Sequence, residues 1–143
     1  LVTDIHTNEP LSLHRTWVTA TGKAEVHPPR LQLANHSLKN GCIKLWPDEE
    51  VGHTLGIAEG IETALSMAHA VQPVWATIDA GHLAQFPVMV GLNELYIGQD
   101  QDPAGIAAAT SCAARWHAAG RRVEVSCQTK NDINDLVGEV LHA

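Results

Sequence analysis

Apolar and polar residues alternate over short runs in the first third of the chain. The pattern extends through LSLHRTWVTATGKAEV (residues 11–26) and GCIKLWP (residues 41–47). Turn-forming dipeptides separate the runs at Thr21-Gly22, Pro28-Pro29 and Asn40-Gly41. A period of two indicates strands, and such dipeptides are typical of turns. Residues 1–50 are therefore predicted to form a small β-rich N-terminal segment that packs on the core.

The period changes after residue 50. TLGIA (residues 54–58) is typical of a buried strand, whereas IETALSMAHAV (residues 61–71) repeats its apolar residues with helical spacing. The spacing places Ile61, Ala64, Leu65, Ala68 and Val71 on one helical face. Further strands are predicted over residues 73–78, 95–98 and 121–127, and helical segments over residues 79–86 and 103–120. The longer helix has a proline in its first turn and Gly120 at its end.

Four strands that alternate with helices predict an α/β fold. Parallel strands need crossover connections, which helices supply, so we expect a mainly parallel four-stranded sheet flanked by helices. INDLVGEVL (residues 133–141) completes the pattern, and residues 51–143 are predicted to form one domain.

Composition narrows the class of protein. The chain has 143 residues, and 16 acidic against 9 basic residues give a net charge of −7, so we expect it to bind nucleic acid weakly by itself. Three widely spaced cysteines argue against a disulfide framework or a zinc module and favour the cytoplasm. No apolar run is long enough for a membrane span. The start at Leu1 predicts a piece of a longer protein.

Acidic residues directly follow the predicted strands. Glu59 follows residues 54–58, and Asp100 and Asp102 follow residues 95–98. Asp132 and Asp135 come just after the last strand, and Asp79 is a weaker case. Ligands bind at the carboxyl ends of strands in such sheets. Two carboxylates side by side repel each other unless a divalent cation binds them, which makes a metal site the leading interpretation.

Structural roles are the alternative for each acidic residue. Glu59 could favour the dipole of the following helix and pair with Thr63. Asp102 precedes a proline and could cap a helix, which leaves Asp100 unexplained. We expect Asp79 to be a helix cap, and Glu62 to be solvated or to support a ligand.

Four segments together resemble the Toprim domain of primases and topoisomerases. They are EGIETALS (59–66), ATIDAGHLAQ (76–85), YIGQDQDPAG (96–105) and KNDINDLV (130–137), in that order. The resemblance spans about residues 54–137 and is greatest to primase-like proteins of phages, plasmids and other mobile elements. Residues 13–33, followed by GCIKLW, also look like the segment that precedes Toprim in those proteins.

The resemblance implies a metal site for Mg²⁺, with Mn²⁺ as a substitute. Glu59, Asp100 and Asp102 match the catalytic acidic positions of the family. Asp132 matches a supporting ligand, although Asn131 separates it from Lys130 in a departure from the family pattern. Whether Asp79, His82 or Lys130 contacts substrate is left open. The residues expected to support the site are Gly60, Glu62, Gly105 and Asp135.

The implied activity is metal-dependent nucleotidyl or phosphoryl transfer. The leading hypothesis is that the chain is the catalytic portion of a DNA primase-like protein that makes RNA primers on single-stranded DNA. Nucleotides would be its substrates, and a zinc module or helicase is expected elsewhere in the parent chain. One alternative is that the same cluster hydrolyses phosphodiesters. Another is that the chain is a non-catalytic nucleotide- or protein-binding module. Topoisomerase activity is disfavoured, because the only tyrosine, Tyr96, is predicted to lie inside a buried strand. The basic residues that could contact phosphates, or be ordinary solvated residues, are Arg15, Lys23, Arg30, Lys39 and Lys44.

Overall fold

A computed structural model of the chain describes residues 1–20, 22–23, 25–27, 30–33 and 36–126. The chain divides into two compact units, Leu1–Gly41 and Cys42–Ala143. The predicted domain boundary at residues 50 and 51, and the packing of the first segment on the second, stay predictions. Within the described ranges, no helix is long and apolar enough to cross a membrane.

The described residues of the first unit form three pairs of short antiparallel strands. They are β1 (Val2–Asp4) with β2 (Pro10–Ser12), β3 (His14–Thr16) with β6 (Arg30–Gln32), and β4 (Val18–Thr19) with β5 (Gly22–Lys23). The turn after β1 is closed by Asp4, whose Oδ1 accepts hydrogen bonds from the backbone N–H groups of His6 and Thr7. Asn40 has a φ of 58°, a left-handed conformation that asparagine tolerates. The β-rich prediction for this part is confirmed.

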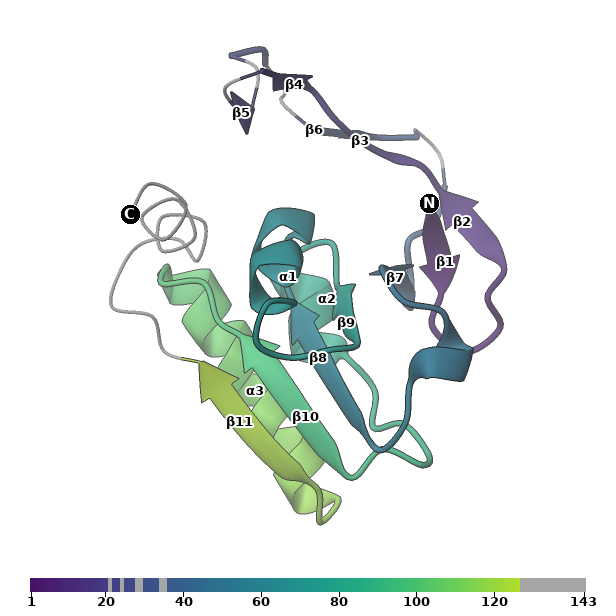
Figure 1. The fold of residues 1–143 in the computed structure, drawn as a ribbon, viewed down its shortest axis with the longest axis vertical. Helices are drawn as coiled ribbons and strands as arrows, with labels where there is room; N and C mark the ends of the chain where they lie inside the picture. Colours follow the sequence, from purple (N-terminus) through teal and green to yellow (C-terminus); the bar gives the residue numbers. More distant parts are fainter. Residues whose placement is uncertain (21, 24, 28–29, 34–35, 127–143) are drawn as a thin grey trace. The chain divides into compact units, whose positions relative to one another are not determined.

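The second unit is built on a sheet of four parallel strands (Figure 1). The strands are β8 (Thr54–Ala58), β9 (Val74–Ala76), β10 (Glu94–Gly98) and β11 (Arg122–Ser126). They lie in the order β11-β10-β8-β9, and β7 (Gly41–Lys44) pairs antiparallel with β9. A short 3-10 helix, η1 (Asp48–Glu50), precedes β8. The predicted α/β fold with a mainly parallel sheet is confirmed.

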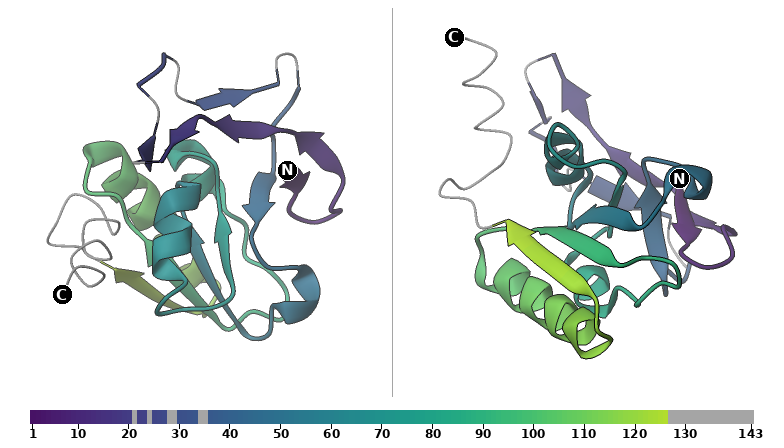
Figure 2. Two further views of the ribbon diagram at one scale, coloured as in Figure 1. Left: turned by 45° about the horizontal axis from the view of Figure 1, so that its top comes forward. Right: turned by 60° about the horizontal axis from the view of Figure 1, so that its bottom comes forward.

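Three helices connect the parallel strands: α1 (Ile61–Met67), α2 (Ala80–Gln85) and α3 (Pro103–Ala118). The chain steps from β8 to β9 and then back past β8 to β10 and β11, so right-handed crossovers should place α1 on one face of the sheet and α2 and α3 on the other. Figures 1 and 2 show α3 along β10 and β11 on the face opposite α1. Phe86, at the end of α2, stacks on Trp116 of α3 with ring centroids 6.3 Å apart.

The α3 helix has the ends that the sequence predicts. Pro103 occupies its first turn, and Gly120, just beyond it, has a φ of 73°. The fully buried side chains between helices and sheet include Leu55, Ile57, Val74, Trp75, Leu83, Phe86, Leu95, Ile97 and Trp116.

The α1 helix is shorter than predicted and buries a different face. It ends at Met67 and buries Ala64 and Met67, whereas Leu65 is 52% exposed, so the predicted face through Leu65 is wrong. Met67 lies over two strand glycines: a Cβ at Gly56 would be 3.1 Å from its Cε, and a Cβ at Gly98 would be 3.2 Å from its Sδ. The helix therefore packs its long thioether where neighbouring strands carry no side chain.

Candidate functional site

The four parallel strands end in register at one edge of the sheet. Cα pairing joins the last residue of each strand in a single row, formed by Ala76, Ala58, Gly98 and Ser126. Glu59 directly follows this row on β8, and Asp100 follows it two residues after the end of β10. Because β8 and β10 are neighbours, two of the predicted acidic residues leave the sheet from adjacent strand ends.

The first turn of α1 lies against the end of β10. A Cβ added at Gly98 would be 3.2 Å from Ala58 Cβ and 3.5 Å from Thr63 Cγ2. The Thr63 hydroxyl donates a hydrogen bond of 3.4 Å to Asp100 Oδ1. A helix that begins two residues after Glu59 thus reaches the carboxylate of Asp100. Glu59 and Asp100 are both half-buried, so their carboxylates are partly shielded from water.

Asp100 is also fixed from the other side by α3. A Cβ at Gly105 would be 2.8 Å from the carbonyl oxygen of Asp100 and 3.0 Å from its Cβ. Gly105 is buried and does not have a positive φ, so it is needed here for close approach. The predicted supporting role of Gly105 gains a physical basis from this contact.

Asp102 caps α3. Its Oδ1 accepts a hydrogen bond of 2.7 Å from the backbone N–H of Gly105, and the residue is exposed. The capping interpretation of Asp102 is therefore confirmed, and its role as a metal ligand stays a prediction.

Gly60 and Glu62 flank the start of α1. Gly60 is the N-cap, with φ −102° and ψ 159°, an extended conformation open to any residue. These angles give no conformational reason for a glycine here, and the supporting role of Gly60 stays a prediction. Glu62 is half-buried in the first turn of the helix, where a carboxylate favours the helix dipole.

Asp79 follows β9, as Glu59 follows β8 and Asp100 follows β10. Asp79 is the N-cap of α2, as expected: its Oδ1 accepts a hydrogen bond from the backbone N–H of His82 at 2.9 Å. The same oxygen lies 2.8 Å from His82 Nδ1. Ile78, directly before Asp79, has a φ of 82°, a rare conformation for a β-branched residue. Substrate contact by Asp79 or His82 stays open.

The carboxylates fit a magnesium ion by their chemistry and by their number. Mg²⁺ prefers oxygen ligands, keeps several waters, and is usually held by one or two carboxylates together with substrate phosphates. Glu59 and Asp100 supply such a pair at adjacent strand ends. Among the residues that the structure describes, no three histidine, cysteine, aspartate or glutamate side chains gather at metal-binding spacing. Asp132 and Asp135, and the open candidate Lys130, lie outside the described residues.

A separate cluster of polar side chains lies at the opposite, amino end of the strands. Glu94 begins β10 and accepts a hydrogen bond of 2.5 Å from Arg122 on β11 and one of 3.0 Å from the Tyr96 hydroxyl. The Arg122 hydrogen bond holds the pKa of Glu94 below its ordinary value, and the Glu94 hydrogen bond raises the pKa of Tyr96. Tyr96 lies within β10 as predicted, but it is half-buried rather than buried.

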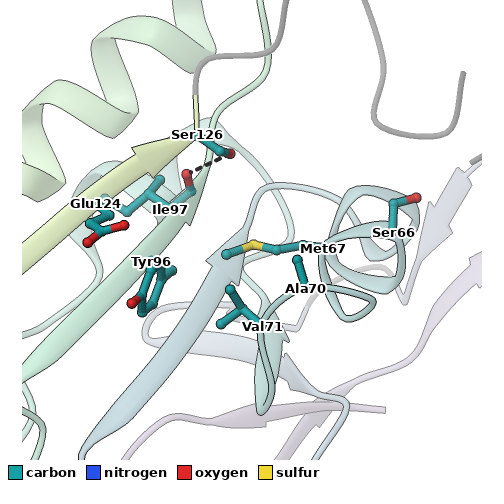
Figure 3. Close-up of a pocket in the computed structure, with 8 residues that line it drawn as sticks. All are labelled: Ser66, Met67, Ala70, Val71, Tyr96, Ile97, Glu124 and Ser126. Atoms are coloured by element: carbon teal, nitrogen blue, oxygen red, sulfur yellow. Dashed lines mark hydrogen bonds between the residues drawn. The ribbon is translucent and has the colours of Figure 1, made fainter. Parts of the chain in front are cut away.

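A hollow of about 170 Å³ lies beside Tyr96 on the α1 face of β10 and β11 (Figure 3). Its lining residues are Ser66, Met67, Ala70, Val71, Tyr96, Ile97, Glu124 and Ser126. The Ser126 hydroxyl donates a hydrogen bond of 3.2 Å to the Ile97 carbonyl, as Figure 3 shows. The hollow therefore adjoins the row of strand ends without containing Glu59 or Asp100.

Sequence reasoning did not identify Thr63 as a partner of Asp100 or Gly98 as a close-packing position. Thr63 was expected as a possible partner of Glu59, because the two are four residues apart. A signal for Gly98 does exist, since it is a glycine at the end of an otherwise apolar strand, where a neighbouring backbone often approaches.

Residues 54–143 match the family model described as the Toprim domain. Two solved structures are similar in fold. A DNA primase domain from Pseudomonas aeruginosa aligns with 96% of this chain at 14% identity and a TM-score of 0.55, and the primase fragment of the bacteriophage T7 primase-helicase protein aligns with 99% at 16% identity and a TM-score of 0.60. The chain spans only 51% and 65% of their respective lengths. A search of curated protein sequences finds no significant match.

Proposed function

Because the chain belongs to the Toprim family, we propose that its acidic sheet edge carries out metal-dependent nucleotidyl transfer. Specifically, we propose that the chain is the catalytic portion of a DNA primase-like protein that makes RNA primers on single-stranded DNA. The observation that carries it is the placement of Glu59 and Asp100 after adjacent, in-register strands, with Thr63 of the intervening helix hydrogen-bonded to Asp100. The fold likeness to two primase structures supports it at the level of architecture.

In this proposal Glu59 and Asp100 hold Mg²⁺ or Mn²⁺, with Asp102 and Asp132 as further predicted ligands. A divalent cation neutralises phosphate oxygens and favours ionisation of the attacking hydroxyl. The bond that forms joins the 3′-hydroxyl oxygen of one nucleotide to the α-phosphorus of the next, and the bond that breaks releases pyrophosphate. Glu59 is assigned as a ligand or as the carboxylate that accepts the hydroxyl proton.

The surrounding residues have positioning roles in this scheme. Thr63 donates to one oxygen of Asp100 and so orients its carboxylate. Gly105 allows α3 to begin directly against the Asp100 backbone. Glu62 and Asp135 are proposed to support the ligands. A template, nucleotides and further domains of a longer parent protein, such as a zinc module or helicase, are the proposed partners.

The direct test is primer synthesis by the 143-residue chain. The chain is incubated with single-stranded DNA, labelled ribonucleotides and Mg²⁺, beside Asp100→Asn, Glu59→Gln and the control Glu50→Gln, an exposed acidic residue of η1. We expect short RNA products from the wild type and the control, and none from the two site variants. Degraded template without new products would indicate a Toprim-type phosphodiester hydrolase instead. Absence of both activities, with no carboxylate-dependent metal binding, would indicate a non-catalytic binding module.

A further inference from the structure

A histidine ring is held by a carboxylate just beyond the end of β9. Asp79 Oδ1 needs only the backbone N–H of His82 to cap α2, yet it also lies 2.8 Å from His82 Nδ1. The side chain of His82 is 22% exposed and that of Asp79 is 52% exposed. With Nδ1 on the carboxylate, the ring has a fixed orientation, and contact with a bound molecule would use Nε2. Ile78, directly before the pair, has a φ of 82°, and such costly backbone conformations gather at functional sites.

The pair lies at the same sheet edge as the predicted metal ligands. Thr77, directly after β9, is fully buried and donates two hydrogen bonds to the carbonyl oxygen of Ala58, from its backbone N–H at 2.8 Å and from its hydroxyl at 3.2 Å. Ala58 directly precedes Glu59, and Asp79 comes two residues after Thr77. The segments that carry Asp79 and Glu59 are thus hydrogen-bonded to each other where they leave the sheet. Asp100 lies on the other side of Glu59, because β8 runs between β9 and β10.

The other basic side chains of the second unit are engaged or lie elsewhere. Within the described residues of this unit, each lysine or arginine bonds to a protein group: Lys44 to Asp48, Arg115 to the Phe86 carbonyl, Arg121 to Asn93, and Arg122 to Glu94. The remaining described histidines precede β8 or lie at the far ends of α1 and α3, and they are His53, His69 and His117. Among the described residues of this unit, His82 is therefore the basic side chain best placed to meet an anion beside Glu59.

We propose that His82, oriented by Asp79, binds the phosphate chain of a nucleoside triphosphate on the β9 side of the metal. A phosphate chain at this edge meets the carboxylates of Glu59 and Asp100, so it needs positive charge beyond the ion that they hold. The protonated ring donates from Nδ1 to Asp79 and from Nε2 to a phosphate oxygen, which makes a charge-assisted hydrogen bond. His82 contacts the substrate, whereas Asp79 positions His82. The inference rests on the proposed function, because it names the side chain that receives the substrate of that site.

The test is calorimetric titration of the 143-residue chain with three probes: Mg²⁺ alone, sodium tripolyphosphate with Mg²⁺, and ATP with Mg²⁺. His82→Ala should raise Kd for both phosphate probes about 10-fold, near the low end for a hydrogen bond between charged groups, because the ring is partly exposed. Asp79→Ser still caps α2 but lacks the carboxylate, so its affinity for both phosphate probes should also fall. Asp79→Asn keeps an oxygen that accepts from Nδ1 and should retain most of the affinity. Binding of Mg²⁺ alone should depend on Asp100 and not on His82.

His69→Ala is the matched control, because His69 is an exposed histidine just after α1, at the opposite end of that helix from Glu59. It should bind all three probes as the wild type does. Nitrogen-15 NMR of the imidazole rings gives a measurement that a purely structural role would not change. Tripolyphosphate with Mg²⁺ should shift the Nε2 signal of His82, identified by its absence in His82→Ala, and leave the His69 signals in place.

Three outcomes would overturn the inference. They are binding of both phosphate probes at wild-type affinity by His82→Ala that is folded by circular dichroism, an unmoved Nε2 signal, and failure of the wild type to bind either phosphate probe. If His82→Ala binds normally while Asp100→Asn still abolishes primer synthesis, the proposed function stands without this contact. Phosphate binding that depends on His82, in a chain that makes no primers, would refute primer synthesis and leave the phosphate site.

Discussion

Replacing Gly105 with alanine is the sharpest test of how the site is assembled. The new Cβ would lie 2.8 Å from the Asp100 carbonyl oxygen, 3.0 Å from Asp100 Cβ and 3.2 Å from Asp100 carbonyl carbon. Two of these three atoms are backbone, so the clash cannot be relieved by rotating a side chain. Either the first turn of α3 or the segment that carries Asp100 must move.

The expected cost combines three contributions. Overpacking of this kind destabilises by about 1–3 kcal/mol. Movement of the turn would weaken the hydrogen bond from Gly105 N–H to the Asp102 cap, a loss of about 1 kcal/mol. Alanine offsets up to about 1 kcal/mol through its higher helix propensity. The net loss of unfolding free energy should be about 1–3 kcal/mol, which corresponds to a fall in Tm of roughly 2–12 °C for a chain of this size.

Urea denaturation and thermal melting of Gly105→Ala and Gly52→Ala provide the measurement. Gly52 is a matched control, because no atom lies within 4 Å of its added Cβ and its φ is not positive. That variant should stay within about 0.5 kcal/mol of the wild type. If Gly105→Ala is as stable as Gly52→Ala, Asp100 does not pack on the start of α3 and the account of the site's geometry fails.

Three further predictions concern single groups. Asp102→Ala should lose about 1 kcal/mol of stability in urea denaturation while Asp102→Asn, which can still cap α3, should not, and equal losses would contradict the capping role. The Arg122 hydrogen bond lowers the pKa of Glu94 in the folded chain below the ordinary value of 4.5. The ionised Glu94 therefore stabilises the fold fully above that value, and this stabilisation is lost as pH falls through the folded pKa. The stability advantage of the wild type over Glu94→Gln should shrink between about pH 6 and about pH 3, and a constant difference would refute the prediction. Burial raises the pKa of Cys112 to about 11, so its alkylation at about pH 8, followed by mass spectrometry, should be far slower in the folded chain than in denaturant, and equal rates would contradict its burial.

Local sequence signals predicted the alternating elements of the second unit well. The apolar run at residues 54–58 and the run within Glu94–Gly98 are each bounded by polar or glycine residues, and the Pro103 and Gly120 signals depend only on neighbours in sequence. Because parallel strands in such a fold end at a common edge, the sequence could also predict that Glu59 and Asp100 lie at that edge, whereas the strand order that makes β8 and β10 neighbours comes from the structure.

Features that depend on contacts between distant segments were not predictable in the same way. Met67 is buried because Gly56 and Gly98 face it from adjacent strands, and that coincidence follows from strand register. The hydrogen bond from Thr63 to Asp100 joins residues 37 apart in the chain. The sequence prediction used only the spacing of apolar residues along the helix. It therefore placed Leu65, which is half exposed, on the buried face and left out Met67.

The central claim, that Glu59 and Asp100 share one divalent cation, is tested most directly by a double-mutant cycle. Calorimetric titration of Mg²⁺ into the wild type, Glu59→Gln, Asp100→Asn and the double variant gives the coupling between the two carboxylates. Each single substitution should weaken the site strongly, and the double substitution should weaken it little further. Magnesium binding by Glu59→Gln that matches the wild type, or losses that simply add, would contradict a shared ion.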